Sequence, residues 1–208
     1  MNRFNLGFNS GFTLGCAALV LFLSSPARAE AKHYNLDPAH TYVSFEAPHI
    51  QAISFWRGKF DHTQSGSVTL DSEAKTGSID VTIDATSIDF GMQKMNDHAK
   101  SPDFFDVAKF PTAVFKSDTV KFDGATPVEA DGELTLHGVT KPVALKINSF
   151  KCIPDPMLKV ERCGADASAE INRSDFGIDY GVKMTGSGSV KLAIQVEGLL
   201  ADKPGPQH

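Results

Sequence analysis

The chain has 208 residues, and it carries 25 acidic residues against 20 lysines and arginines, a formal net charge of −5. Its positive charges are spread along the sequence and form no basic cluster. A net-acidic chain of this kind is a poor match for nucleic acid or for an anionic membrane surface, so we expect neither as a partner. The length suffices for one domain with a sizeable apolar core and no structural metal.

The first 29 residues differ in composition from the rest of the chain. They carry Arg3 and Arg28 but no acidic residue, and an uncharged stretch, Gly11–Leu23, precedes a small-x-small pattern at Ala29. That stretch is shorter than the ~20 apolar residues that span a membrane, and the whole pattern is typical of a cleaved export signal. We predict a signal peptide over residues 1–29 and a periplasmic location, with an uncleaved anchor as the alternative. Cleavage takes the net charge from −5 to −7.

Residues 30–200 contain no linker, internal repeat or second apolar run of membrane length, which predicts one domain and no stable membrane insertion. We expect residues 201–208 (ADKPGPQH) to form a flexible tail. Removal of the leader leaves two cysteines, Cys152 and Cys163. An even pair in an oxidising compartment predicts a disulfide. The alternative is a redox-active pair, which usually has the tighter Cys-x-x-Cys spacing.

Apolar and polar residues alternate with period two through most of this domain, which is typical of half-buried antiparallel strands. In chain order the alternating apolar positions are Val43/Phe45/Ala47, Val68/Leu70, Ile79/Val81/Ile83/Ala85, Ala113/Phe115, Val128/Ala130/Gly132/Leu134/Leu136, Val143/Leu145/Ile147, Ala165/Ala167/Ala169/Ile171 and Val190/Leu192/Ile194/Val196. Turn residues separate them at Ser65-Gly66, Lys75-Thr76-Gly77, Asp123-Gly124 and His137-Gly138. About eight such strands predict a mainly β fold, either a barrel or a sandwich.

One segment lacks the alternation. Residues 93–100 contain helix-tolerant residues, and Ser101-Pro102-Asp103 combines an N-cap residue, a proline at the first helical position and an early carboxylate. These signals predict a short helical segment near residues 93–107, with a helix starting at Ser101.

The inward-facing positions vary in size, which bears on whether the interior is filled. Several strands offer Val, Ile, Leu or Phe, whereas Ala165, Ala167, Ala169, Gly186 and Gly188 present almost no side chain. Small eight-stranded barrels either fill with side chains or hold one small ligand, and the pattern leaves both interiors open. A hollow interior of this kind would select an apolar ligand.

The sequence contains no Gly-x-Ser-x-Gly elbow, no His-Glu-x-x-His pair and no phosphate-binding glycine-rich loop, so we expect neither an enzyme nor a metal or other cofactor. Its histidines are dispersed. A set formed by Asp37, His40, His49 and His98 through folding is the competing hypothesis, a metal or acid/base site.

Five separated blocks of the sequence resemble the YceI-like polyisoprenoid-binding family. They are Tyr34-x-x-Asp37-x-x-His40-Thr41-x-Val43-x-Phe45 with His49 and Gly58-x-Phe60, His98-x-x-Ser101-x-Asp103-Phe104-Phe105-Asp106, Lys109-Phe110-Pro111-x-x-x-Phe115-x-Ser117, Gly132-x-Leu134-Thr135-Leu136-x-Gly138-Val139-Thr140-Lys141-Pro142-Val143 and Arg173-Ser174-Asp175-Phe176-Gly177-Ile178. The resemblance implies one antiparallel, lipocalin-like β-barrel over residues 30–200. It also implies a periplasmic carrier without enzymatic activity that holds an isoprenoid quinone or polyprenyl phosphate, and it allows a homodimer.

We therefore predict that inward strand residues contact the ligand: Val43, Phe45, Ile79, Val81, Ile83, Phe115, Leu134, Leu136, Leu145, Ala167, Ala169, Val190 and Leu192. The candidate contacts for a ligand head group are His40, His49 and His98. A stress-response or protein-interaction module with a filled barrel is the main alternative function, and a His/Asp metal or hydrolytic site is the other.

Overall fold

The structure, a computed structural model, describes Met1 and residues 30–201. The predicted signal peptide, apart from Met1, and residues 202–208 of the predicted tail lie outside the described residues. No helix in the described part of the chain is long and apolar enough to cross a membrane.

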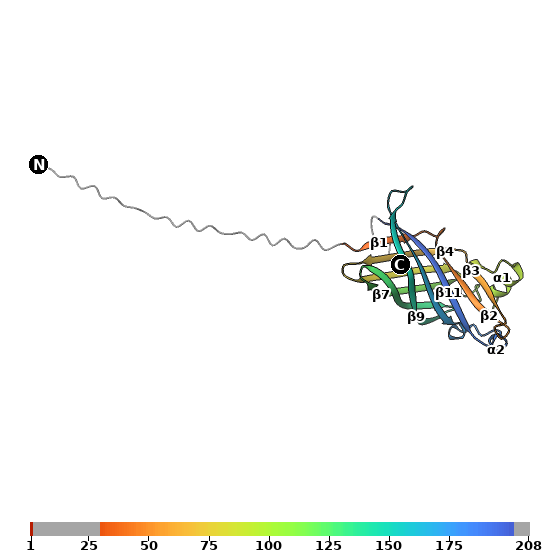
Figure 1. Cartoon of the computed structure of the whole chain (residues 1–208). Coiled ribbons are helices and arrows are strands. Elements are labelled where there is room, and N and C mark those ends of the chain that lie inside the picture. Colours follow the sequence, from red (N-terminus) through yellow and green to blue (C-terminus); the bar gives the residue numbers. More distant parts are fainter. Residues whose placement is uncertain (2–29, 202–208) are drawn as a thin grey trace.

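The described chain is mainly antiparallel β-structure wound into a barrel (Figure 1). The strands are β1 (Lys32–Leu36), β2 (Tyr42–His49), β3 (Ser54–Phe60), β4 (Thr63–Asp71), β5 (Thr76–Asp84), β6 (Ile88–Asp89), β7 (Thr112–Asp123), β8 (Thr126–Leu136), β9 (Val139–Pro154), β10 (Glu161–Asn172) and β11 (Ser189–Leu200). Their order in the sheet is β1-β4-β5-β7-β8-β9-β10-β11, and a further β1–β11 pairing closes this ring of eight strands. The predicted eight-stranded antiparallel barrel is confirmed.

The sheet has more strands than the eight that close the ring, and the first two strands show how the additional ones are placed. β1 pairs with the end of β11, where Leu36 lies opposite Gly198, and β2 pairs with an earlier part of the same strand, where Tyr42 lies opposite Gln195. β1 and β2 therefore share one position in the ring. On their other side they pair with β4 and β3, respectively. The sequence pattern did not predict β3. Its inward positions are Trp56, Gly58 and Phe60, and the glycine in the middle interrupts the apolar alternation.

Two of the predicted turns have different outcomes. Ser65-Gly66 lies inside β4, opposite Thr82 and Val81 on β5, so the turn predicted there is wrong. A glycine is needed at this point of the strand because a Cβ atom on Gly66 would lie 2.5 Å from Leu36 Cδ1. His137-Gly138 does form the tight β8–β9 turn, with φ of 51° and 74°. Such positive φ values are typical of two-residue hairpin turns.

The main helix lies before Ser101, the residue at which the sequence predicted that a helix would start. α1 spans Gln93–Lys100, and Ser101 is its C-cap, where both the backbone N–H and the hydroxyl donate to the carbonyl of His98. Ser101 therefore ends the helix, and the prediction that it starts one is wrong. A second, shorter helix, α2 (Val182–Thr185), was not predicted. Two single 3-10 turns, η1 (Ala85–Ser87) and η2 (Arg173–Phe176), complete the helical structure of the described residues.

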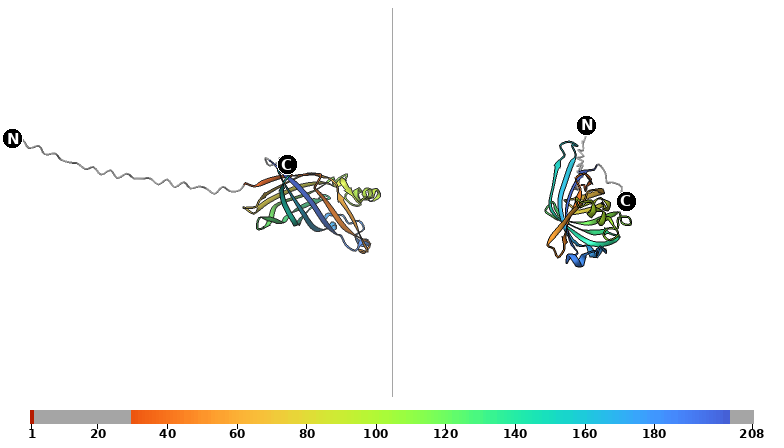
Figure 2. Two further views of the ribbon diagram at one scale, coloured as in Figure 1. Left: turned by 45° about the horizontal axis from the view of Figure 1, so that its top comes forward. Right: turned by 90° about the vertical axis from the view of Figure 1, so that its right-hand side faces the viewer.

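The barrel has two different ends, which the figures separate clearly. The loop end consists of residues 49–54, 85–111 and 173–188 and includes both helices (Figures 1 and 2). The disulfide end consists of the β4–β5 and β7–β8 turns and the β9–β10 hairpin, which projects from the barrel (Figure 2). Three of the largest fully buried side chains lie near the loop end. They are Phe176, Ile88 and Ile178, which pack with Ala85, Ala99 and other residues in one apolar cluster.

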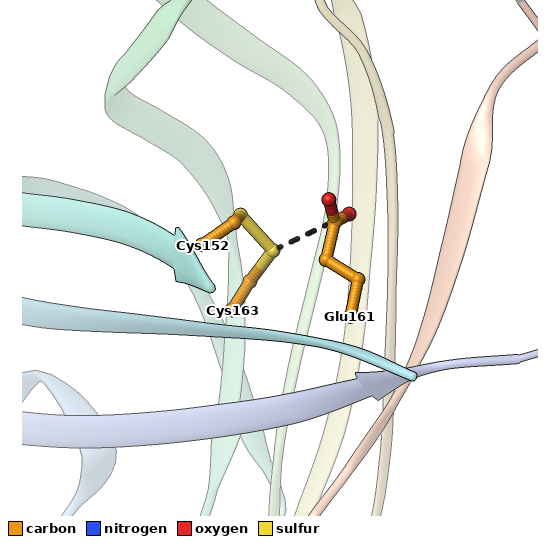
Figure 3. A group of neighbouring side chains, drawn as sticks. All are labelled: Cys152, Glu161 and Cys163. Atoms are coloured by element: carbon orange, nitrogen blue, oxygen red, sulfur yellow. Dashed lines mark hydrogen bonds between the residues drawn. A yellow bond between two sulfur atoms is a disulfide. The ribbon is translucent and has the colours of Figure 1, made fainter. Parts of the chain in front are cut away.

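The β9–β10 hairpin contains the predicted disulfide (Figure 3). Cys152 and Cys163 lie directly opposite each other in register, with their Cα atoms 4.0 Å apart, and their sulfurs are bonded. The closed loop is short, and such a cross-link stabilises a fold by roughly 2–4 kcal/mol. The tip of the hairpin is held by Asp155, whose carboxylate accepts hydrogen bonds from the N–H groups of Met157 and Leu158.

Candidate binding cavity

An elongated cavity of about 500 Å³ occupies the barrel interior. Its lining begins at the disulfide end with Tyr34, Phe150 and Cys163 and continues to the loop end, where it includes Trp56 and Met184. Every strand except β6 contributes lining residues, and most of those residues are apolar. Because inward residues alternate with outward ones along each strand, the period-two pattern places one apolar row of every strand on this wall.

Small residues on the wall leave this space open. Gly164, Ala165 and Ala167 on β10 and Gly198 on β11 all line the cavity, and none of them carries a side chain long enough to cross it. Side chains on the opposite wall of the barrel therefore face open space and do not pack against a side chain from these positions. The sequence left the choice between a filled and a hollow barrel open, and the structure shows the hollow one.

The structure places nearly all of the predicted barrel residues on the cavity wall. The lining includes Val43, Phe45, Ile79, Val81, Ile83, Phe115, Leu134, Leu136, Leu145, Ala167, Val190 and Leu192. Ala169 is the exception, because it does not itself line the cavity. It lies opposite Leu192 in the β10–β11 register, and the larger leucine provides the lining surface at that point.

The three histidines predicted as head-group contacts lie in different places. His49 and His98 line the cavity at the loop end. His40 does not line it, and its Nδ1 lies 2.8 Å from Asp37 Oδ2 in the segment between β1 and β2, with its side chain half exposed. His40 is therefore removed from the candidate ligand contacts. The period-two pattern could not show this, because the connection between the two strands has no alternation.

The competing metal or acid/base set is not assembled. In the described residues, no group of three or more His, Cys, Asp or Glu ligand atoms within 4.8 Å of one another includes Asp37, His40, His49 or His98. Asp37 instead belongs to an ion-pair network, where its carboxylate accepts a hydrogen bond of 2.9 Å from Arg162 Nη1. The Arg162 guanidinium holds the pKa of Asp37 below its ordinary value, with a smaller contribution from His40.

Aromatic side chains gather at the loop end of the cavity. The ring centroids of His98, Phe104 and Tyr180 lie 4.9 to 5.1 Å from one another, and all three residues line the cavity. His98 Nε2 also lies 3.4 Å from a carboxylate oxygen of Asp103. On the β2–β3 hairpin, the rings of His49 and Trp56 are 5.2 Å apart. Edge-to-face contacts at these distances stabilise aromatic clusters and hold their rings in place.

Arg173 is a charged lining residue whose place on the cavity wall the sequence did not predict. It is the first residue of η2, and its guanidinium donates hydrogen bonds of 2.8 Å to the carbonyls of Ile178 and Tyr180. Its Cζ atom lies 5.6 Å from the centroid of the Phe104 ring. Burial lowers the pKa of this guanidinium, and the charge of Asp179 partly opposes the shift. The sequence signal for this residue was the Arg-Ser-Asp-Phe-Gly-Ile block, which gave no indication of where the side chain points.

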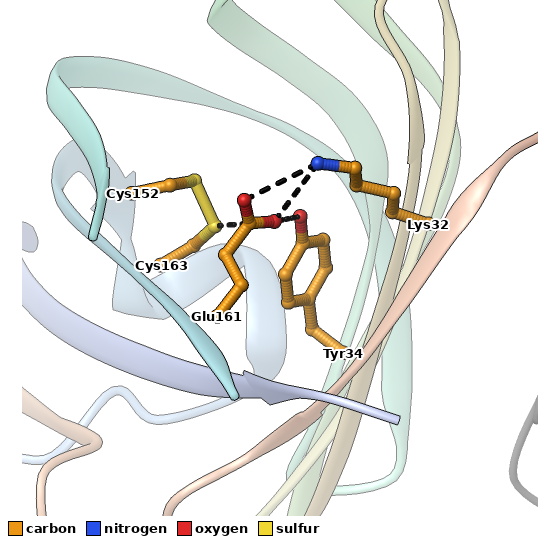
Figure 4. The surroundings of a disulfide bond; sticks show 5 residues. All are labelled: Lys32, Tyr34, Cys152, Glu161 and Cys163. Atoms are coloured by element: carbon orange, nitrogen blue, oxygen red, sulfur yellow. Dashed lines mark hydrogen bonds and ion pairs between the residues drawn. A yellow bond between two sulfur atoms is a disulfide. The ribbon is translucent and has the colours of Figure 1, made fainter. Parts of the chain in front are cut away.

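A polar cluster lies around the disulfide at the opposite end of the barrel (Figure 4). The Tyr34 hydroxyl donates a 2.6 Å hydrogen bond to Glu161 Oε1, and Lys32 Nζ lies 3.1 Å from the same oxygen. Burial and the Glu161 carboxylate raise the pKa of Tyr34, whereas the tyrosine hydroxyl lowers that of Glu161. Ligand atoms of Cys152, Glu161 and Cys163 lie within 4.8 Å of one another (Figure 3). Because both sulfurs form the disulfide, they are not free thiolates that could bind a metal.

Comparison with known proteins places this barrel in a family. The YceI-like domain matches residues 34–198, which is most of the chain and nearly the whole described barrel. The chain belongs to the YceI-like family. A UPF0312 protein of Vibrio parahaemolyticus is 32% identical over 190 residues, covering 90% of this chain and 97% of that protein. A UPF0312 protein of Pseudomonas aeruginosa is 34% identical with the same coverage.

Solved structures with the same fold agree with this YceI-like assignment. The Campylobacter jejuni YceI protein superposes with a TM-score of 0.61 at 25% identity, covering 75% of this chain and 91% of that protein. Burkholderia cenocepacia BcnA gives a TM-score of 0.61 at 23% identity, covering 78% and 98% of the two chains. A polyisoprenoid binding domain from Saccharophagus degradans gives 0.60 at 17% identity, covering 81% and 98%. The identities of these last two structures are low, so they establish the fold alone.

Proposed function

We propose that this YceI-like protein is a binding or carrier protein that holds a long apolar isoprenoid lipid inside its barrel. The observation that carries the proposal is the cavity of about 500 Å³, which is continuous along the barrel and lined mainly by aliphatic and aromatic side chains. The fold shared with a domain described as polyisoprenoid binding supports the same ligand class.

The shape and chemistry of the wall favour a chain over a compact ligand. Lining residues extend from Cys163 at the disulfide end to Met184 at the loop end, so a ligand that fills the cavity is elongated. The wall between these ends offers mainly dispersion contacts. Each buried CH₂ group contributes about 0.8 kcal/mol, so a branched hydrocarbon chain binds tightly there with little polar recognition.

The proposed location is the periplasm, after removal of residues 1–29. Support comes from the composition of that segment and from the Cys152–Cys163 disulfide, because structural disulfides persist in oxidising compartments. The first residue of the mature protein, read by N-terminal sequencing of protein from a periplasmic fraction, tests this. Glu30 is the expected residue, and Met1 would overturn the proposed cleavage.

Native mass spectrometry of the protein purified without detergent from its own periplasm tests the ligand. We expect an added mass that organic solvent releases and that fragments as a polyisoprenoid. A protein that is reproducibly empty, and that takes up neither geranylgeraniol nor geranylgeranyl phosphate when these are supplied, would overturn the proposal. Light scattering on the same sample tests the homodimer that the family resemblance allows.

A further inference from the structure

The cavity wall has an unusual charge composition for a chain that is acidic overall. No Asp, Glu or Lys in the described residues lines the cavity, and Arg173 is the one lining residue with a permanent charge. The whole chain, in contrast, has 25 acidic residues against 20 lysines and arginines. The single fixed charge that faces the apolar interior is therefore positive, at the loop end.

Arg173 has no carboxylate partner within ion-pair distance among residues 30–201. No salt bridge involves it, and its two hydrogen bonds go to the neutral carbonyls of Ile178 and Tyr180. Asp179 is close enough to influence its charge but does not line the cavity. Asp103, which precedes Phe104 in the sequence, lies 3.4 Å from His98 Nε2. A partly buried guanidinium without a counter-charge is costly to desolvate, and an anion in the cavity would compensate it.

The side chain is also held in position for such an anion. The two carbonyl bonds fix the guanidinium plane, and the face of the Phe104 ring lies 5.6 Å from Cζ. A guanidinium has five N–H donors, so two carbonyl bonds leave three for a ligand. Little side-chain entropy remains to be lost on binding, because the fork is already oriented. Arg173 thus combines unused donors, a charge without an ion-pair partner among residues 30–201 and a fixed geometry at one end of a hydrocarbon cavity.

We propose that Arg173 is the head-group site of this cavity and that the lipid it selects is an isoprenoid with an anionic phosphate head. The inference rests on the proposed function and adds the class of head group to it. His98 and Tyr180, which line the cavity beside Phe104, surround the site. The hydrocarbon chain then runs from the loop end towards Tyr34 at the disulfide end. A neutral head group, such as an alcohol or a quinone, leaves the guanidinium without a counter-charge.

The test compares two probes of identical chain length, geranylgeranyl phosphate and geranylgeraniol, by isothermal titration calorimetry at concentrations below micelle formation. A charge-assisted contact distinguishes the two, so we expect the wild type to bind the phosphate at least about tenfold more tightly. In Arg173→Gln the affinity for the phosphate should fall until the two affinities come within about twofold of each other. Lys183→Gln is the matched control, because Lys183 lies on α2 at the same end and does not line the cavity.

Equal affinity of the wild type for both probes would overturn the inference while leaving the proposed function intact. So would an Arg173→Gln variant that keeps the tenfold preference, or one that loses both probes equally. Failure of the wild type to bind either probe would overturn the proposed function and, with it, this inference. Circular dichroism checks folding, since Arg173 also holds the loop. If Arg173→Gln is unfolded, Arg173→Lys replaces it and should keep a preference for the phosphate above about threefold, whereas no preference would contradict the assignment.

Discussion

A single substitution in the middle of β10 tests whether the cavity is the binding site. Ala167 lines the cavity with 6% of its surface exposed, and it lies opposite Ile147 on β9 and Ile194 on β11. An indole ring at this position enters the cavity, since the inward face of the strand points nowhere else. Ala167→Trp should therefore exclude part of an isoprenoid chain without touching either end of the cavity.

The expected loss follows from the hydrocarbon that the ring displaces. One isoprenoid unit has five carbons, and at about 0.8 kcal/mol per buried CH₂-sized group its exclusion costs about 4 kcal/mol. That corresponds to an increase in Kd of up to about a thousandfold, and at least tenfold if the chain shifts along the cavity. Because the ring enters an empty space, the free energy of unfolding of the ligand-free protein should change by less than about 3 kcal/mol.

Titration calorimetry with geranylgeraniol measures the Kd, and urea unfolding measures the stability. The matched control is Ala144→Trp, which places the same ring on the outer face of β9, at an exposed residue opposite Asp131 that does not line the cavity. A folded Ala167→Trp protein whose Kd for geranylgeraniol stays within about twofold of the wild-type value would contradict binding inside the barrel. An equal loss in Ala144→Trp would do the same.

Three further predictions concern stability. Replacing both Cys152 and Cys163 by serine should lower the free energy of unfolding by roughly 2–4 kcal/mol. A reductant should lower the thermal midpoint of the wild type but not that of the variant. A wild-type midpoint that is the same with and without reductant would contradict a structural role for the disulfide. The N–H of Leu158 and the Arg162 guanidinium hold the pKa of Asp155 at about 2, so the stabilisation from its charged form is present at neutral pH and is lost as the pH falls from about 4 to about 2. Arg162→Gln should therefore weaken this acid dependence in urea unfolding, and parallel curves for the two proteins would disprove the assignment. Phe176→Ala, at a side chain that is 1% exposed, should lower the free energy of unfolding by about 3–5 kcal/mol. A loss below about 1 kcal/mol would show that the neighbouring side chains move in to fill the space.

The strand pattern was readable from the sequence because it depends on local alternation. Once one residue of a strand faces inward, period two assigns every other residue, and inward positions such as Val81 and Leu134 follow directly. The His137-Gly138 turn was readable for a similar reason, since its positive φ angles favour few residue types. The same local reasoning failed at Ser65-Gly66, where the glycine makes room for Leu36 from another strand.

The disulfide and the family were also evident before the fold was known. Two of the three cysteines lie outside the predicted signal peptide, so the sequence predicted one intramolecular pairing, and the structure forms it. The helical segment predicted near residues 93–107 was placed only approximately by the sequence, because the helix itself spans Gln93–Lys100. The signals at Ser101 suit either end of a helix, and the actual end depends on its bonds to His98.

From the sequence alone, the alternation predicted a mainly β fold with one apolar face on each strand, and the short motifs indicated the YceI-like family and, through it, a closed barrel. The folded structure was needed to show that the barrel is hollow, that His40 lies outside the cavity lining and that Arg173 lines the cavity. Whether a barrel is filled depends on how inward side chains from all its strands add up across the interior. The environment of a charge depends on which distant groups surround it, and neither property is carried by the residues in one stretch of sequence.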